Sequence, residues 1–159
     1  QFHNMLVPFG ITGRPHPDSP IYSDVKPEGN GGKIAFSASI DASPGWQHYK
    51  KWRREWMSPQ PGVLSIIDEY SLKEGAGVEF LWQTHLPARI CGKTVVITGR
   101  RGQVVLEIPD GASVKIENFP MFEGAPLLGR GKEVVHKRIV IAKDGRRGKL
   151  EVKASLLPV

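Results

Sequence analysis

Residues 78–85 read VEFLWQTH, a stretch in which two sets of side chains alternate along the chain. The first set is Val78, Phe80, Trp82 and Thr84, and the second is Glu79, Leu81, Gln83 and His85. A period of two is typical of a β-strand that turns one face to a core. The same alternation recurs at residues 114–117 and 150–156, so we expect strands there as well.

Further strands and short turns are predicted along most of the chain. Runs rich in β-branched residues lie at 94–98, 103–108 and 134–142. Turn signals lie between them at 99–102, Asp110-Gly111 and 144–148, and Asp-Gly pairs are typical of hairpins. Eighteen glycines and thirteen prolines interrupt most stretches where a helix could persist. We therefore expect an all-β protein, an antiparallel two-layered sandwich or jelly roll of about ten or more strands.

The length of 159 residues suits one domain with a real core, so residues 1–159 are expected to form a single domain. Two segments, 12–32 and 118–132, are rich in turn-forming residues and are predicted to be loops. The chain starts at Gln1 and reads like mid-domain sequence from Phe2 onwards, which indicates a piece of a larger protein. No apolar stretch is long enough to cross a bilayer.

The net charge is +6 and the sequence pI is about 9.6. A basic surface raises the local concentration of polyanions, and nucleic acid, acidic polysaccharide and anionic membrane all fit that description. Charge alone does not choose among them. The one cysteine, Cys91, cannot form an internal disulfide and is interpreted as a small buried apolar residue.

The segment 46–56 combines basic and aromatic residues. In a strand, Trp52, Arg54 and Trp56 share one face, while Arg53 lies on the other face with Glu55 and Met57. Guanidinium groups pair with carboxylates or sulfates, so this mixture suits a sugar-acid polymer, and it also suits single-stranded nucleic acid. The alternative is a pair of core tryptophans beside solvated arginines. We favour the core for both tryptophans and leave both arginines open.

Two other constellations carry weak signals. Asp68-Glu69 follows an apolar run, and such a pair is more often an edge facing water than a glycosidase centre. His3, His48 and either Asp18 or Asp24 would make a zinc site if they met in space. No compact metal-binding motif supports this grouping.

Taken in order, four segments resemble the carboxy-terminal β-sandwich of heparinase II/III-like polysaccharide lyases. The resemblance rests on a strand that opens with His-Asn, an Arg-Arg segment, a strand that ends in Asp-Glu and a strand that ends in histidine. These segments are 3–7, 51–54, 66–69 and 80–85. Beyond His85 the resemblance is only architectural.

The resemblance implies β-elimination in an acidic polysaccharide that contains uronic acid, either a glycosaminoglycan or alginate. It implies that most of the catalytic groups lie on a preceding helical toroid, so we expect this chain alone to be inactive. It gives His3 a catalytic role and makes Asn4, Trp52, Arg53 and Arg54 candidates for substrate binding. His3, Asp24 and His48 become candidate ligands of a zinc ion, with the second histidine position ambiguous between His48 and Trp52.

The main alternative function is a non-catalytic carbohydrate-binding or structural sandwich, which the basic and aromatic residues fit equally well. A nucleic-acid binder ranks third, because none of the sequence signatures of such proteins is present. No membrane partner is expected. The family resemblance implies a bacterial parent protein that is periplasmic or secreted.

Overall fold

The computed structural model describes residues 5–11, 27–43, 46–123 and 132–158, except for the side chains at 121–123 and 133. Twelve strands and no helix run through these residues. In chain order they are β1 (Leu6–Phe9), β2 (Pro27–Gly31), β3 (Phe36–Asp41), β4 (Tyr49–Ser58), β5 (Val63–Leu72), β6 (Gly77–Thr84), β7 (Ala88–Cys91), β8 (Thr94–Thr98), β9 (Gly102–Glu107), β10 (Ala112–Glu123), β11 (Lys132–Asp144) and β12 (Arg147–Pro158). The all-β prediction is therefore confirmed. The described residues contain no helix that is long and apolar enough to span a membrane.

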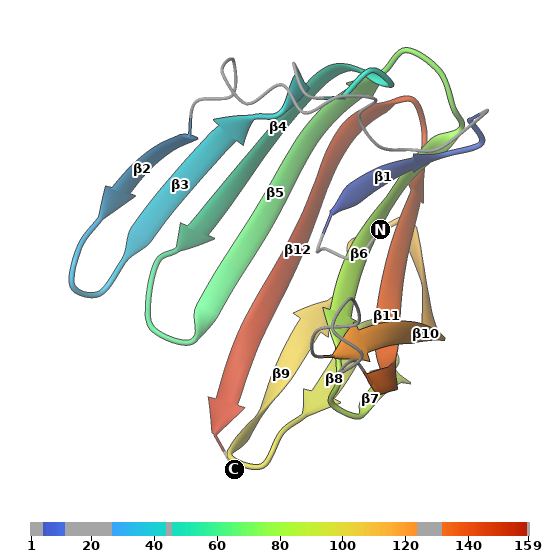
Figure 1. The fold of residues 1–159 in the computed structure, drawn as a ribbon. Coiled ribbons are helices and arrows are strands. Elements are labelled where there is room, and N and C mark those ends of the chain that lie inside the picture. The colour runs from blue at the N-terminus through green and yellow to red at the C-terminus, as the bar shows by residue number, and fades with distance from the viewer. Residues whose placement is uncertain (1–4, 12–26, 44–45, 124–131, 159) are drawn as a thin grey trace.

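The strands form two antiparallel sheets of unequal width (Figure 1). The narrow sheet has the order β1-β6-β11-β10, and the wide sheet has the order β2-β3-β4-β5-β12-β9-β8-β7. The wide sheet curls so that its last strand, β7, contacts β10 at the edge of the narrow sheet. Strands β2 and β3 lie at the opposite end of the wide sheet, far from β10 (Figure 1). The predicted two-layered architecture is thus confirmed.

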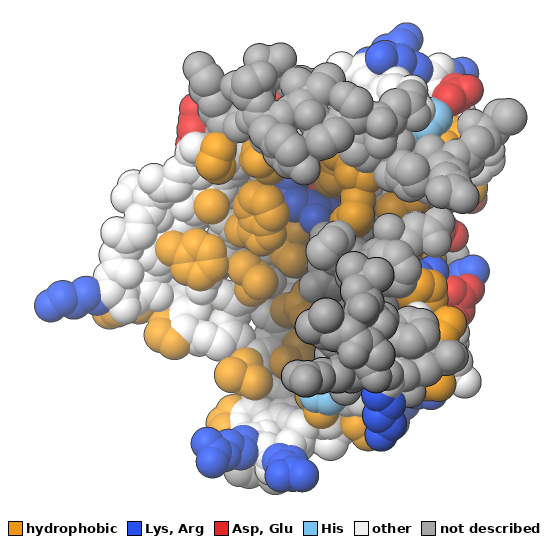
Figure 2. Space-filling model, in the orientation of Figure 1, with side chains coloured by type: hydrophobic (Ala, Val, Ile, Leu, Met, Phe, Trp, Pro, Cys, Tyr) orange, Lys and Arg blue, Asp and Glu red, His pale blue; other side chains and the backbone are white. Residues whose placement is uncertain are grey.

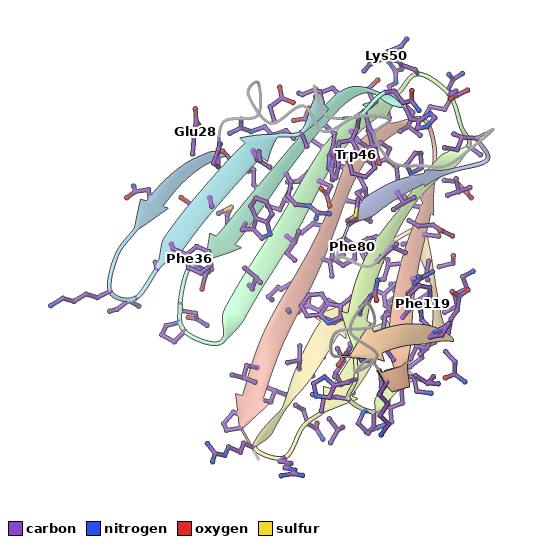
Figure 3. All side chains as sticks on the ribbon, in the orientation of Figure 1. Glu28, Phe36, Trp46, Lys50, Phe80 and Phe119 are labelled. Atoms are coloured by element: carbon purple, nitrogen blue, oxygen red, sulfur yellow. The ribbon has the colours of Figure 1, made fainter. Side chains whose placement is uncertain are left out.

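The core lies between the two sheets and is filled by the alternating residues of both. Phe80, Ile139 and Ile141 come from the narrow sheet, and Phe80 projects into the space between the layers (Figure 3). Leu106 and Leu150 are among the residues that the wide sheet contributes. Burying one such side chain fully stabilises the fold by about 1.5–3 kcal/mol before the entropy of ordering is counted.

Strand β6 buries apolar residues on both of its faces. Val78 and Phe80 face the main core, as the alternation predicts. Leu81 lies on the opposite face, where it is also buried with Val7 and Val140. The prediction of one buried face on this strand was therefore incomplete, because the alternation does not show that the outer face of the narrow sheet is covered here.

The predicted loop at 118–132 was too long. Strand β10 continues to Glu123, and its ladder with β11 extends to the pair Glu123–Lys132. Pro120 lies within β10 and has no N–H to donate, but β10 is an edge strand, where that loss is tolerated. A proline in the sequence therefore did not end the strand.

Two other predicted boundaries were also wrong. Residues 27–31 of the predicted loop 12–32 form β2, which pairs with β3. Arg147 and Gly148, assigned to a turn in the sequence, begin β12 and pair with β5. The turn is shorter than predicted because Gly145, at a φ of 109°, reverses the chain immediately after β11.

We predict that Gly77→Ala destabilises the fold by about 1–3 kcal/mol, because a close backbone approach leaves no room for a Cβ atom. A Cβ at Gly77 would overlap the carbonyl oxygen of Lys143 and lie 2.7 Å from the ring of Phe9. The measurement is chemical denaturation followed by tryptophan fluorescence. Gly31→Ala is the matched control, because a Cβ at Gly31 meets nothing within 4 Å. Equal stability of the two variants would contradict the close packing of Gly77 against Lys143 and Phe9.

Candidate functional site

A buried ion pair links β4 to β5 inside the sandwich. Asp68 has no exposed surface and Arg54 is only 6 % exposed. The Arg54 guanidinium donates through Nε to Oδ1 of Asp68 and through Nη2 to Oδ2, both at 2.7 Å. Trp52 donates from Nε1 to the same Oδ1 at 2.7 Å. Because a buried charge is costly unless it is paired and hydrogen-bonded, these three residues form one structural unit.

Aromatic rings surround this ion pair. The Arg54 guanidinium carbon lies 5.4 Å from the ring centre of Trp52, 5.9 Å from that of Trp56 and 5.5 Å from that of Phe80. Such distances permit cation–π attraction. Trp52 also stacks on Tyr49, with ring centres 5.0 Å apart. The arrangement gives Trp52 and Arg54 a role in the core, so their assignment to substrate binding stays a prediction that their burial does not favour.

His48 is buried, and both of its ring nitrogens lie near other side chains. Nδ1 lies 2.7 Å from Oε1 of Glu74, and Nε2 lies 3.4 Å from the amide nitrogen of Gln47. A metal would have to replace Gln47 at Nε2, while Glu74 would orient the ring from Nδ1. No group of three histidine, cysteine, aspartate or glutamate side chains suited to a metal occurs in the part of the chain that the structure describes. The described residues therefore do not by themselves make a zinc site.

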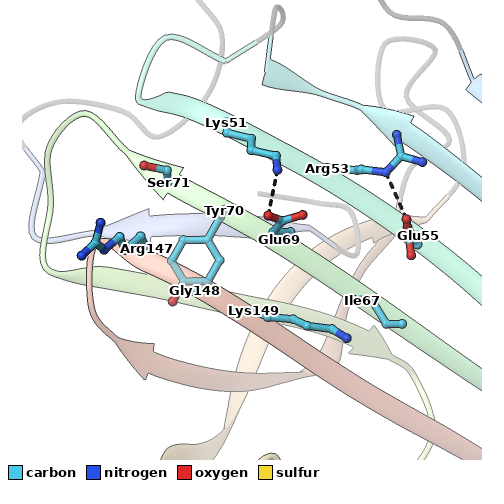
Figure 4. Close-up of a pocket in the computed structure, with 10 residues that line it drawn as sticks. All are labelled: Lys51, Arg53, Glu55, Ile67, Glu69, Tyr70, Ser71, Arg147, Gly148 and Lys149. Atoms are coloured by element: carbon cyan, nitrogen blue, oxygen red, sulfur yellow. Dashed lines mark hydrogen bonds and ion pairs between the residues drawn. The ribbon is translucent and has the colours of Figure 1, made fainter.

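Arg53 lies on the outer face of the wide sheet, as the alternation along β4 predicts. It borders a groove of about 550 Å³ that crosses β4, β5 and β12 (Figure 4). The groove is lined by Lys51, Arg53, Glu55, Ile67, Glu69, Tyr70, Ser71, Arg147, Gly148 and Lys149. Four of these side chains are basic and two are acidic, which leaves a net charge of +2.

Two ion pairs organise the charges of this outer groove. Lys51 donates to Glu69 at 2.7 Å, and Arg53 donates through Nε to Glu55 at 3.0 Å. The hydrogen bond from Lys51 lowers the pKa of Glu69, and the positive charges of Arg53 and Lys149 lower it further. Glu69 is therefore ionised at neutral pH and is an unsuitable proton donor.

A second groove, of about 310 Å³, lies on the inner face of the wide sheet, and none of the described residues that line it is charged. It is lined by Phe36, Ser58, Gly62, Val63, Leu64, Trp82, Val104, Ala154 and Leu156. Phe36 is 47 % exposed and Leu156 is 57 % exposed. Apolar side chains gather over β3 and β4, beside the narrow sheet (Figure 2). An apolar groove cannot pair the carboxylates of an acidic glycan, so of the two grooves only the outer one suits such a ligand.

Three predicted site residues, His3, Asn4 and Asp24, lie outside the described residues. Of the others, the structure brings Trp52 and Arg54 together in the core and places Arg53 on the opposite face of the same strand. The His48 ring contacts Glu74 and Gln47.

The sequence interpretation missed Arg147 and Lys149, which complete the outer groove. The alternation of Glu151, Lys153 and Ser155 along β12 extends backwards to both positions, so the signal was present in the sequence. It was overlooked because the glycine at 148 made this segment resemble a turn. That β12 lies beside β5, and hence near Lys51 and Arg53, depends on a pairing between strands far apart in the chain.

Comparison with solved structures shows which proteins share this fold. A heparan sulfate lyase, HepC from Pedobacter heparinus, matches with a TM-score of 0.73 and 13 % identity over 98 % of this chain and 24 % of that chain. A heparinase III gene product matches with a TM-score of 0.71 and 14 % identity over 99 % of this chain and 24 % of its own. The matched part is the carboxy-terminal domain of the lyases. This chain thus spans about a quarter of their length, and the predicted resemblance is confirmed at the level of the fold.

No protein-family model matches the sequence, and no curated protein matches it either. At 13–14 % identity, the similarity establishes that the sandwich fold is shared, and it does not assign the roles of individual residues.

We predict that Arg54→Met destabilises the protein by about 3–5 kcal/mol, because it leaves the Asp68 carboxylate buried without a counter-charge. The double variant Arg54→Met with Asp68→Leu should recover a large part of that loss, since it removes both charges. The free energy of unfolding from urea denaturation measures each effect.

The matched control is Arg53→Met, which removes an arginine from the exposed face of the same strand and should shift the midpoint only slightly. Equal losses of unfolding free energy for Arg53→Met and Arg54→Met would show that Arg54 does not stabilise the fold by pairing with the buried Asp68. The same conclusion would follow if the double variant recovered no stability.

Proposed function

We propose that the chain is the carboxy-terminal sandwich domain of a lyase that cleaves uronic-acid-containing polysaccharide by β-elimination. The observation that supports this proposal best is the fold similarity to heparan sulfate lyases over 98 % of the chain. The chain spans 24 % of those proteins, so the proposal includes a preceding domain, expected to be a helical toroid. A bacterial periplasmic or secreted location belongs to the same proposal.

The reaction makes three demands on the enzyme. The uronate carboxylate must be neutralised, because this makes the proton on the adjacent carbon acidic. A base then removes that proton, a carbon–carbon double bond forms, and the bond to the glycosidic oxygen breaks. A general acid protonates the departing oxygen. Positioned hydrogen-bond donors and an acid/base pair therefore suffice.

Only part of this chemistry is assigned to the present chain. We assign His3 the role of a proton-transfer or substrate-contacting group, and Asn4 and Arg53 the role of substrate contacts. Arg53 is the one of these three that the structure describes, and its guanidinium is accessible on the outer face. His3 and Asp24 lie outside the described residues, so the ligand roles of His3, Asp24 and His48 stay predictions, and no step is assigned to a metal.

A non-catalytic carbohydrate-binding module is the second candidate. The observation that favours it is the outer groove, which carries a net positive charge and whose acidic residues, Glu55 and Glu69, are both ion-paired. Such a groove can hold an acidic glycan, and both of its carboxylates are already engaged by basic side chains.

The decisive experiment compares this chain with the full product of its reading frame on heparan sulfate and on alginate. The ultraviolet absorbance of unsaturated uronate products measures turnover. We expect the longer protein to be active and the 159-residue chain to be inactive. His3→Ala in the longer protein should lower the rate by about 10²-fold or more, as expected for loss of a general acid or base.

Near-ultraviolet circular dichroism of the His3→Ala protein provides the control for folding. Turnover by the 159-residue chain alone would contradict the proposed division of the site. If the longer protein is inactive on both substrates but retains acidic glycans, the binding-module function replaces the lyase.

A further inference from the structure

We propose that the outer groove on β4, β5 and β12 binds one disaccharide unit of an anionic polysaccharide between two rows of basic side chains. The first row is Lys51 and Arg53 on β4, and the second is Arg147 and Lys149 on β12 (Figure 4). The identity of the glycan as a uronic-acid polymer rests on the proposed function, whereas the binding site rests on the groove itself.

The spacing of the two rows matches the repeat of such a polymer. Strand β5 lies between β4 and β12 in the wide sheet, so the rows are two strand spacings apart. With neighbouring strands 4.7–4.9 Å apart, this separation is about 9.5 Å. It is comparable to the length of one disaccharide in an extended chain. In a glycosaminoglycan, the uronate carboxylate recurs once in each disaccharide. Each row can therefore contact the acidic group of a successive repeat.

The two rows differ in how much of their charge is already paired. Lys51 and Arg53 are held by Glu69 and Glu55. Among the described residues, Arg147 and Lys149 have no carboxylate within ion-pair distance, and both are exposed. A carboxylate or sulfate therefore binds first at Arg147 and Lys149, where a guanidinium offers two parallel donors. Lys51 and Arg53 on β4 then contribute weaker contacts, because the glycan must compete with Glu69 and Glu55 for them.

The floor between the rows suits a sugar better than a nucleic-acid base. Ile67 and Ser71 project from β5 into the groove and offer an apolar contact and a hydroxyl. Among the described residues of the lining, Tyr70 is the only aromatic one, and only 2 % of it is exposed. Binding of single strands depends on exposed aromatic rings on which bases stack, and the described lining of this groove offers none.

Neighbouring grooves on the same face show that the positive charge is local. The groove at β2, β3 and β4 is lined by one basic and two acidic side chains: Arg53, Glu28 and Glu55. The groove near β8, β9 and β12 is lined by two basic and three acidic side chains: Lys93, Lys153, Glu107, Asp110 and Glu151. Both linings carry one net negative charge, so a polyanion is attracted to the groove between them.

The test is affinity electrophoresis of the 159-residue chain through gels that contain heparan sulfate, with gels that contain neutral dextran as the blank. The double variant Arg147→Gln with Lys149→Gln should bind heparan sulfate about five- to tenfold more weakly, because two exposed charge contacts are lost. The matched control is Arg100→Gln with Arg101→Gln, which removes the same charge from the exposed turn between β8 and β9. This control should keep wild-type retardation within about twofold.

Equal weakening in both double variants would overturn the groove site, because it would mean that net charge alone retains the glycan. Unchanged binding in the Arg147 and Lys149 variant would also overturn it. Stronger competition by single-stranded DNA than by heparan sulfate, at one salt concentration, would assign the groove to nucleic acid instead. Lyase assays of the longer protein report separately on the proposed function, so loss of turnover there leaves a positive binding result intact.

Discussion

The buried pair of Arg54 and Asp68 is the constraint on which the rest of the wide sheet depends. A carboxylate with no exposed surface is tolerated only because one guanidinium binds both of its oxygens and the Trp52 indole donates a further hydrogen bond. Arg54 and Asp68 are direct cross-strand partners in the β4–β5 ladder. A slip of one residue would turn one of the two charges to the other face and leave its partner buried alone, so the pair fixes the register as well as the inner face of both strands.

That register also determines the chemistry of the outer face. With Arg54 inside, the alternation of β4 places Lys51 and Arg53 outside, where they lie opposite Ser71 and Glu69. The ladder between β5 and β12 in turn brings Lys149 opposite Glu69. The outer groove is therefore a direct consequence of a buried interaction on the other side of the same sheet.

The two faces of the wide sheet consequently suit different contacts. The described residues of the inner groove are uncharged and include Phe36 and Leu156, whereas those of the outer groove are polar and carry a net positive charge. An acidic glycan needs paired charges and hydrogen bonds, which the outer groove supplies and the inner groove does not. Under the proposed function, this domain would hold such a polymer while a preceding domain would carry most of the proton-transfer groups. The chain spans about a quarter of the lyases that share its fold, and the proposal rests on that partial coverage.

The sequence by itself determined which side chains alternate along each strand and roughly where the hairpins turn. A period of two predicted that Val78 and Phe80 would be buried together and that Arg53 and Arg54 would lie on opposite faces, because side-chain direction in a strand is a local property. It did not determine which arginine would be buried, nor that Arg147 would join Lys51 and Arg53 in one groove. The first outcome depends on the narrow sheet packing over the inner face of β4, where Phe80 lies beside Arg54. The second follows from the position of β12 beside β5, which depends on how distant strands bury their apolar faces together. The end of β10 was predicted too early from the sequence, because a proline indicates the end of a strand unless that strand is known to lie at the edge of a sheet. Local alternation thus fixed the direction of each side chain, and only the tertiary structure decided which side chains meet, because pairing between distant strands is a property of the whole core.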